Sequence, residues 1–206
     1  MKTKDLLEVL QEEIHSVIIA TVNKNGLPAT RVIDIMLYDE DSIYFITAKG
    51  KEFFEQLMEQ PYIFITGMTG GASTMQKKSI SLRGQVKNIG KEKLNEVFKK
   101  NPYMLEIYPK EESREALTVF QFYEGQGEYF DLSVKPITRI SFQVGSIAVE
   151  KRGYFITQQC NGCKLCYLKC PQQCISFGKP FVIHQEHCLH CGNCMSVCPL
   201  GAVEKK

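Results

Sequence analysis

Two cysteine-rich runs near the end of the chain carry its clearest chemical signal. The segments CNGCKLCYLKCP (160–171) and CLHCGNCMSVCP (188–199) share the spacing C-x-x-C-x-x-C-x-x-x-C-P. Thiolates at this density bind soft metals and iron–sulfur clusters. Structural zinc usually takes two separated C-x-x-C pairs for one ion, and two triplets plus two single cysteines do not divide that way. The spacing therefore predicts two 4Fe-4S clusters.

Both runs belong to an internal repeat. A shift of 28 residues (182 minus 154) places 154–175 on 182–203. Each copy predicts a short strand, a cysteine loop, a helical turn carrying the third and fourth cysteines, and a second short strand after the proline. Two copies of this length indicate a small α+β domain with pseudo-two-fold symmetry rather than a solenoid.

The repeated segment, residues 154–204, strongly resembles the bacterial two-cluster ferredoxins. In that family the fourth ligand of each cluster comes from the other repeat. The resemblance implies a single-electron carrier with an electron-donor or electron-acceptor protein as partner. It also implies these ligands: Cys160, Cys163, Cys166 and Cys198 for cluster I, and Cys188, Cys191, Cys194 and Cys170 for cluster II.

Three further side chains lie near the implied clusters. Cys174, the ninth cysteine, aligns with Ala202 in the repeat, and we expect it to fill space in the core because free cysteine behaves as a small apolar residue. His187 and His190 flank cluster II, where they could tune its potential, but exposed loop residues are the simpler expectation.

The elements that precede this segment have a different composition. Residues 1–150 contain no cysteine, and six or so strands interrupted by short helices predict a small closed or partly closed β-barrel. We place the boundary at 148–153, which gives domains 1–150 and 151–206. The expected helices are 3–14, 51–60 and 90–100, and the expected strands are 17–23, 31–38, 42–47, 62–66, 79–86, 117–123, 127–133 and 140–144.

Residues 15–90 of the first domain resemble the FMN-binding split barrels of the pyridoxamine 5′-phosphate oxidase type. The shared pattern is an early strand, a G-x-P turn, an Arg that opens the next strand, a hairpin ending in YF-T, and a Lys before a helix that ends at Q-P. The resemblance implies a mainly β fold with some helix, FMN as cofactor (the deazaflavin F420 is the alternative), and a homodimer with the flavin at its interface. No Rossmann or P-loop glycine motif is present.

Physical chemistry agrees with the flavin site that the resemblance implies. Arginine can bind a phosphate through two parallel hydrogen bonds, and the N-terminus of a helix favours anions. Taken singly, Arg31 could instead pair with Asp34 or Glu40, and Lys51 could be a solvated residue at a helix start. The implied flavin contacts are Arg31, Thr47, Lys49 and Lys51 around the phosphate, and Val32, Ile33 and Ser79 along the ring.

Composition and charge limit the other possibilities. No apolar run reaches the roughly 18 residues of a membrane span, and the N-terminus does not read as a signal peptide, so we expect a cytoplasmic protein with reduced cysteines. Residues 1–150 carry 18 basic against 21 acidic side chains, and residues 151–206 carry 7 against 2. Four thiolates give each oxidised cluster a negative charge, which offsets the basic excess, so we expect no nucleic-acid partner.

The two resemblances together predict an FMN-dependent oxidoreductase. Its two 4Fe-4S clusters would relay single electrons between an external redox partner and the flavin, which would act on a small-molecule substrate. No side chain stands out as a catalytic acid or base. Two alternatives fit the same sequence: a non-catalytic electron carrier with the barrel as a dimerisation scaffold, and a redox or flavin sensor.

Overall fold

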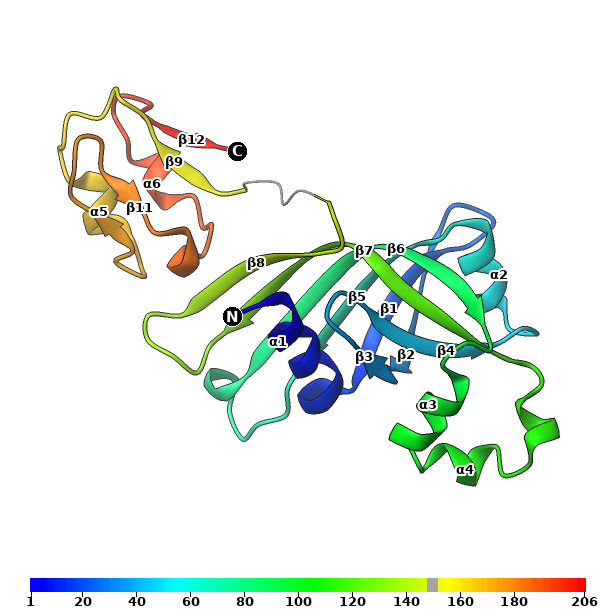
Figure 1. Ribbon diagram of the computed structural model, residues 1–206. Helices are drawn as coiled ribbons and strands as arrows, with labels where there is room; N and C mark the ends of the chain where they lie inside the picture. Colours follow the sequence, from blue (N-terminus) through cyan, green and yellow to red (C-terminus); the bar gives the residue numbers. More distant parts are fainter. Residues whose placement is uncertain (148–151) are drawn as a thin grey trace.

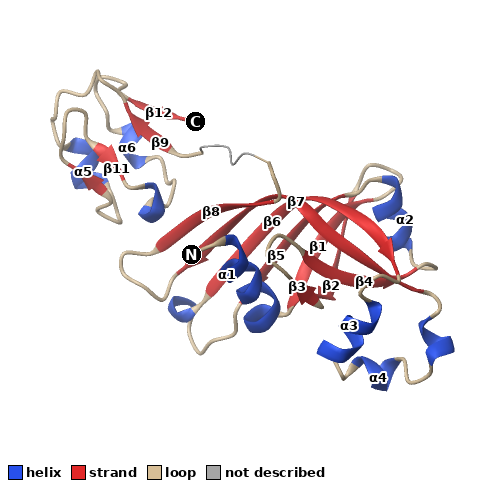
Figure 2. Ribbon diagram, viewed as in Figure 1, coloured by secondary structure: helices blue, strands red, loops and turns tan. Residues whose placement is uncertain are grey.

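A curved antiparallel sheet is followed in the chain by a small cysteine-rich domain (Figures 1 and 2). The computed structural model describes residues 1–147 and 152–206. The predicted boundary at 148–153 falls mostly on residues 148–151, which lie outside the described residues. No helix in the described part of the chain is long and apolar enough to cross a bilayer.

The sheet of the first domain has eight strands among the described residues. Their order is β2-β1-β5-β6-β7-β4-β3, and β8 also pairs with β7. The long strand β7 pairs first with β4 and then with β8, which bends the sheet into a half-barrel. The strands are β1 (Ser16–Val22), β2 (Pro28–Asp34), β3 (Leu37–Tyr38), β4 (Ile43–Ala48), β5 (Tyr62–Met68), β6 (Lys78–Gly90), β7 (Leu117–Asp131) and β8 (Thr138–Val144).

Short helices close the inner side of the sheet. Leu6, Leu7 and Leu10 are fully buried against it, and full burial of one such side chain contributes about 1.5–3 kcal/mol. A second buried cluster lies beneath the two helices after β6. The helical segments are α1 (Thr3–Glu8), the π-helical η1 (Val9–Ile14), α2 (Glu52–Glu59), η2 (Thr74–Gln76), α3 (Leu94–Lys100), α4 (Met104–Ile107) and η3 (Glu111–Arg114).

Two strand predictions were wrong in detail. Residues 117–123 and 127–133 were expected to be separate strands, but β7 runs through Gly125 without a turn. A Cβ at Gly125 would lie 2.3 Å from the Arg83 carbonyl oxygen, so the glycine permits close strand contact rather than a turn. The predicted strand 31–38 is split into β2 and β3, because the amide of Ile35 bonds to His15 and that of Met36 to Tyr44.

The cysteine-rich domain has the predicted pseudo-two-fold repeat. Strands of one copy pair with strands of the other: β9 (Tyr154–Ile156) with β12 (Val203–Lys205), and β10 (Ile175–Ser176) with β11 (Val182–Ile183). The helical segments are α5 (Leu165–Lys169), η4 (Gln185–His187) and α6 (Asn193–Ser196). The third cysteine of each run lies on its helix, while the fourth, expected on the same helical turn, follows it.

The outer face of the sheet is divided into an apolar and a polar part. One row of paired residues crosses six strands: Val32, Ile18, Thr66, Ser81, Glu128 and Ser141. Val32, Ile18 and the neighbouring Phe64 are exposed apolar side chains on β2, β1 and β5. The polar part, on β6 to β8, faces the cysteine-rich domain, whose His187 Nδ1 lies 3.0 Å from the Ile137 carbonyl oxygen (Figure 1).

Candidate functional site

The structure gathers the eight predicted cluster cysteines around two separate pockets. Cys160, Cys163, Cys166 and Cys198 line the first pocket. Its other walls are largely apolar and include Phe181. Three of these cysteines come from the first run and one from the second, so the ligand set implied by the resemblance is brought together across the repeat.

The second pocket holds the complementary set. Cys188, Cys191 and Cys194 line it together with Cys170 from the first run. In the described part of the chain no three His, Cys, Asp or Glu side chains gather as closely as a single metal ion would require. The four thiols of each set are instead spread around a cavity. That arrangement suits a cluster with several metal atoms.

The environment of these thiols combines burial with hydrogen bonds to sulfur. Burial raises the pKa of Cys166 and Cys188, and raises that of Cys194 to about 11. The amide of His190 donates to Cys188 Sγ at 3.4 Å, and the amide of Ala202 donates to Cys198 Sγ at 3.3 Å. Amide donors of this kind stabilise thiolates, the form in which cysteine binds metal.

Cys174 is buried in the core of the small domain, where the repeat alignment places a small apolar residue. It also lines the second pocket, and its Sγ lies 3.5 Å from Cys170 Sγ. Burial, followed by the interaction with Cys170, raises the pKa of its thiol. The thiol therefore remains neutral next to a predicted ligand.

Arg31 lies at the end of the half-barrel where α2 packs. Its Nη1 donates to Thr21 Oγ1 and its Nη2 to Gln56 Oε1, both at 2.8 Å, and its guanidinium lies 4.4 Å from the centre of the Phe53 ring. Neither Asp34 nor Glu40 is its partner: Asp34 accepts from Ser16, and Glu40 pairs with Lys4. These contacts use two of the five N–H donors of the guanidinium.

The other predicted phosphate contacts lead into α2. Thr47 lies one residue before the end of β4, and its buried Oγ1 has no hydrogen-bond partner within the described residues. Lys49 and Lys51 follow it and are exposed, and Lys51 is the N-cap of α2, with no side-chain hydrogen bond to the first turn. Glu52 is the nearby acid, and it accepts from Gln56 Nε2 at 2.8 Å.

Each of these residues offers a hydrogen-bond donor or a positive charge, which is the chemistry that a phosphate group needs. Burial lowers the pKa of the Arg31 guanidinium, so a bound anion would offset the cost of desolvating its charge. The unpartnered Thr47 hydroxyl supplies a further donor, and the uncapped α2 terminus supplies backbone N–H groups. Their role in binding flavin stays a prediction.

The predicted ring contacts are not all brought together. Val32 is 69% exposed on β2, and Ile33 packs against the core. Ser79 lies on β6 opposite Met68. Strands β1 and β5 separate β6 from β2, so Ser79 lies roughly 14 Å from the Val32 strand within one chain.

Sequence reasoning missed the residues that hold Arg31 in place. Gln56 is a buried polar side chain on the apolar face of α2, one turn after Phe53. A glutamine at the spacing of core residues is a signal that could have been recognised. His190, expected to be an exposed loop residue, is half-buried and lines a pocket between the two domains.

Comparison with known families identifies both parts of the chain. The pattern described as "Pyridoxamine 5'-phosphate oxidase" matches residues 3–127, and that described as "4Fe-4S dicluster domain" matches residues 159–202. A protein named Ferredoxin 7Fe from Hydrogenibacillus schlegelii is 40% identical over 53 residues, which are 24% of this chain and 68% of that protein.

Solved structures share the fold of the first domain. A NimC/NimA family protein from Clostridium acetobutylicum has a TM-score of 0.56 at 18% identity and covers 70% of this chain and 95% of its own. A protein related to general stress protein 26 (pyridoxinephosphate oxidase family) from the same organism has a TM-score of 0.52 at 15% identity, with 68% and 92% covered. A heme binding protein from Mycobacterium smegmatis has a TM-score of 0.52 at 11% identity, with 66% and 55% covered.

Proposed function

The chain belongs to the pyridoxamine 5′-phosphate oxidase family, and from this membership we propose that it is an FMN-dependent oxidoreductase. Two 4Fe-4S clusters relay single electrons between an external redox partner and the flavin, and the flavin acts on a small substrate. The family matches confirm both resemblances seen in the sequence. They make redox electron transfer the general role of the chain.

The observation that carries this proposal is the sorting of eight cysteines into two pockets, each with three thiols from one run and one from the other. This is the arrangement expected of a two-cluster ferredoxin. We therefore assign cluster I to Cys160, Cys163, Cys166 and Cys198, and cluster II to Cys188, Cys191, Cys194 and Cys170.

For the flavin we assign the phosphate to the group around α2. Arg31 and Thr47 would donate hydrogen bonds, with Lys49 and Lys51 adding positive charge at the helix start. When bound, FMN supplies hydride and single-electron chemistry, and the clusters supply single-electron transfer. F420 remains the alternative cofactor at this site.

The apolar part of the outer sheet face favours a second hypothesis, in which the barrel is a dimerisation scaffold for an electron carrier. Val32, Ile18 and Phe64 are 69%, 48% and 44% exposed on adjacent strands. A contiguous apolar patch of this kind is typical of a protein interface. We propose a homodimer in either case, and only flavin content and turnover separate the two functions.

Purification without oxygen tests the proposal directly. An oxidoreductase of this kind carries flavin absorption bands on the broad iron–sulfur absorbance, and denaturation releases FMN. A protein that contains clusters but no flavin would support the hypothesis of an electron carrier whose barrel is a dimerisation scaffold. A flavin-loaded protein that reduces no tested substrate with a reduced ferredoxin as donor would favour a carrier or sensor.

Arg31→Ala is the sharper test of the phosphate assignment. We expect the flavin content to fall at least about tenfold, because a charge-assisted hydrogen bond contributes about 1.5–3 kcal/mol. Arg114→Ala is the matched control, since Arg114 also lies over an aromatic ring, at 4.3 Å from the centre of Phe98 on α3. Unchanged flavin content in Arg31→Ala would refute the assignment.

A further inference from the structure

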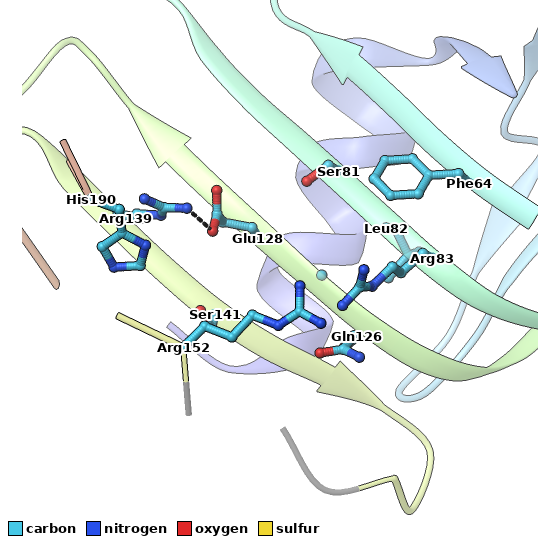
Figure 3. A pocket seen from close by; sticks show the side chains of 11 residues that line it. Phe64, Ser81, Leu82, Arg83, Gln126, Glu128, Arg139, Ser141, Arg152 and His190 are labelled. Carbon is cyan, nitrogen blue, oxygen red and sulfur yellow. Dashed lines mark ion pairs between the residues drawn. The ribbon is translucent and has the colours of Figure 1, made fainter. Parts of the chain in front are cut away.

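A pocket between the two domains combines three arginines from three segments. Arg83 comes from β6, Arg139 from β8, and Arg152 from the segment before β9. The pocket has a volume of about 190 Å³, and Figure 3 shows Arg83 and Arg152 entering it from opposite sides. From this geometry we propose that the pocket binds a small organic anion through a carboxylate or phosphate group.

Charge is the first argument for an anion. One carboxylate, that of Glu128, also lines the pocket, so arginines outnumber acids among the lining residues. Glu128 Oε2 pairs with Arg139 Nη2 at 2.6 Å, as the dashed line in Figure 3 marks. Like charges that line one pocket raise each other's energy, and an anion between them relieves this repulsion.

Unused hydrogen-bond donors are the second argument. Arg139 Nε is buried and has no hydrogen-bond partner within the described residues. Across the described ranges 1–147 and 152–206, the Arg83 side chain makes no hydrogen bond or ion pair. Buried donors are normally satisfied, and arginine is the side chain best suited to grip carboxylate or phosphate.

The remaining walls restrict the kind of anion. Ser81, Ser141 and Gln126 offer neutral hydrogen-bonding groups, and Phe64 provides an apolar wall. A volume of about 190 Å³ is enough to hold a small metabolite. The chemistry is that of a short carboxylic acid or a small phosphate ester.

The position of His190 connects this pocket to the cysteines. Its side chain lines the pocket, while its amide donates to Cys188 Sγ at 3.4 Å. A bound anion would therefore lie close to cluster II, a step that rests on the ligand set assigned under the proposed function. Because reduction adds negative charge to the cluster, an anion nearby favours the oxidised state and lowers the reduction potential. By linkage, reduction of the cluster weakens anion binding to the same extent.

The test begins with calorimetric titration of the full-length protein, purified without oxygen, at constant ionic strength. Inorganic phosphate and malonate serve as probes. We expect a binding site that becomes at least about tenfold weaker in Arg83→Gln and in Arg139→Gln, because each change removes a charged donor. Lys99→Gln, on the exposed face of α3, is the control and keeps the affinity of the unaltered protein.

Failure of both probes to bind, or equal affinity in the Arg83→Gln protein, would overturn the anion site. Arg83 and Arg139 are not among the residues assigned to the flavin, so the effect of their variants separates this site from the flavin assignment. The Arg83 side chain makes no hydrogen bond or ion pair among the described residues, so its variant remains informative if Arg139→Gln does not fold.

Redox titration followed by electron paramagnetic resonance tests the link to cluster II. Saturating phosphate should lower the potential of one cluster and leave the other unchanged, and Arg83→Gln should abolish the shift. A tenfold preference of the anion for the oxidised state corresponds to about 59 mV for one electron. An equal shift of both clusters, or none, would contradict the link.

Discussion

At the scale of single residues, Cys166 and Cys170 lie within one stretch of five residues and line different pockets. Cys166 is on α5 and faces Cys160 and Cys163, whereas Cys170 follows the helix and faces Cys188. Pairing of β9 with β12 brings the end of the second copy beside the start of the first. The fourth thiol of each set therefore comes from the other copy.

Cysteine variants test this crossing. Cys198→Ala and Cys160→Ala should lose the same cluster, so each should retain about half of the iron and show the same residual paramagnetic signal. Cys188→Ala should retain the other cluster. The check is iron analysis with electron paramagnetic resonance of the reduced proteins. If Cys198→Ala and Cys188→Ala gave the same residual signal, each run would hold its own cluster.

Asp131, at the end of β7, leads to a prediction about how the stability of the fold depends on pH. Burial raises its pKa, but hydrogen bonds from Ser133 and from the Tyr129 hydroxyl outweigh burial, so the net pKa is lowered. A lowered pKa means that the stabilisation is complete above the unfolded pKa of about 3.9 and is lost as the pH falls through the folded value.

Asp131→Asn should therefore lower the free energy of unfolding by about 1–3 kcal/mol at pH 7, and the difference from the unaltered chain should shrink below about pH 4. Urea unfolding of the metal-free chain, followed by far-ultraviolet circular dichroism, measures the free energy of unfolding of both proteins at each pH. Asp41→Asn, at an exposed position, should change little at either pH. A difference that stayed constant with pH would rule out the carboxylate as its source.

At the scale of elements, the glycines of β6 and β7 determine how closely the two strands approach. A Cβ at Gly125 would lie 2.5 Å from Phe122 Cζ, and one at Gly84 would lie 2.0 Å from the Glu124 carbonyl oxygen. Gly125→Ala should lower the free energy of unfolding by about 1–3 kcal/mol or more, because the strand backbone must move. Gly70→Ala, whose Cβ would meet nothing within 4 Å, is the control, and an equal loss of stability there would contradict this reason.

These glycines also show which parts of the fold the sequence predicts. Strands with alternating burial, such as β1 and β5, and the helix α2 were expected from periodicity. At Gly125 the sequence predicted a break between two strands. Glycine is common both in turns and where two backbones approach closely, and only the position of β6 shows that the second case applies here. The repeat, by contrast, predicted the short strands of the small domain, although their pairing came from the structure.

At the scale of the whole molecule, the two candidate ligand sites differ in how far the sequence reveals them. The cysteines follow a spacing that identifies them without a structure. Arg83, Arg139 and Arg152 have no such spacing and meet only because the small domain lies against β8. The polar part of the outer face thus belongs to the contact between domains, and the apolar part is left for another partner.

That partner is a second copy of the chain in our proposal, and Ile18 provides the test. Ile18→Glu would place a charge at the centre of the apolar part, where Ile18 pairs with Val32 on one side and Thr66 on the other. Burying an unpaired carboxylate in an interface costs several kcal/mol, so we expect the variant to be monomeric by light scattering on a sizing column.

Ile107→Glu, at a position 61% exposed on α4, should leave the dimer intact. Ile18 is not among the predicted flavin contacts. If the Ile18→Glu protein lost both its flavin and its ability to dimerise, the flavin would lie at the interface rather than within one chain. A monomeric unaltered protein, or a dimeric Ile18→Glu protein, would refute the proposed interface. A monomeric variant that retained its flavin would instead show that Arg31 and the α2 terminus hold the cofactor without help from a second chain.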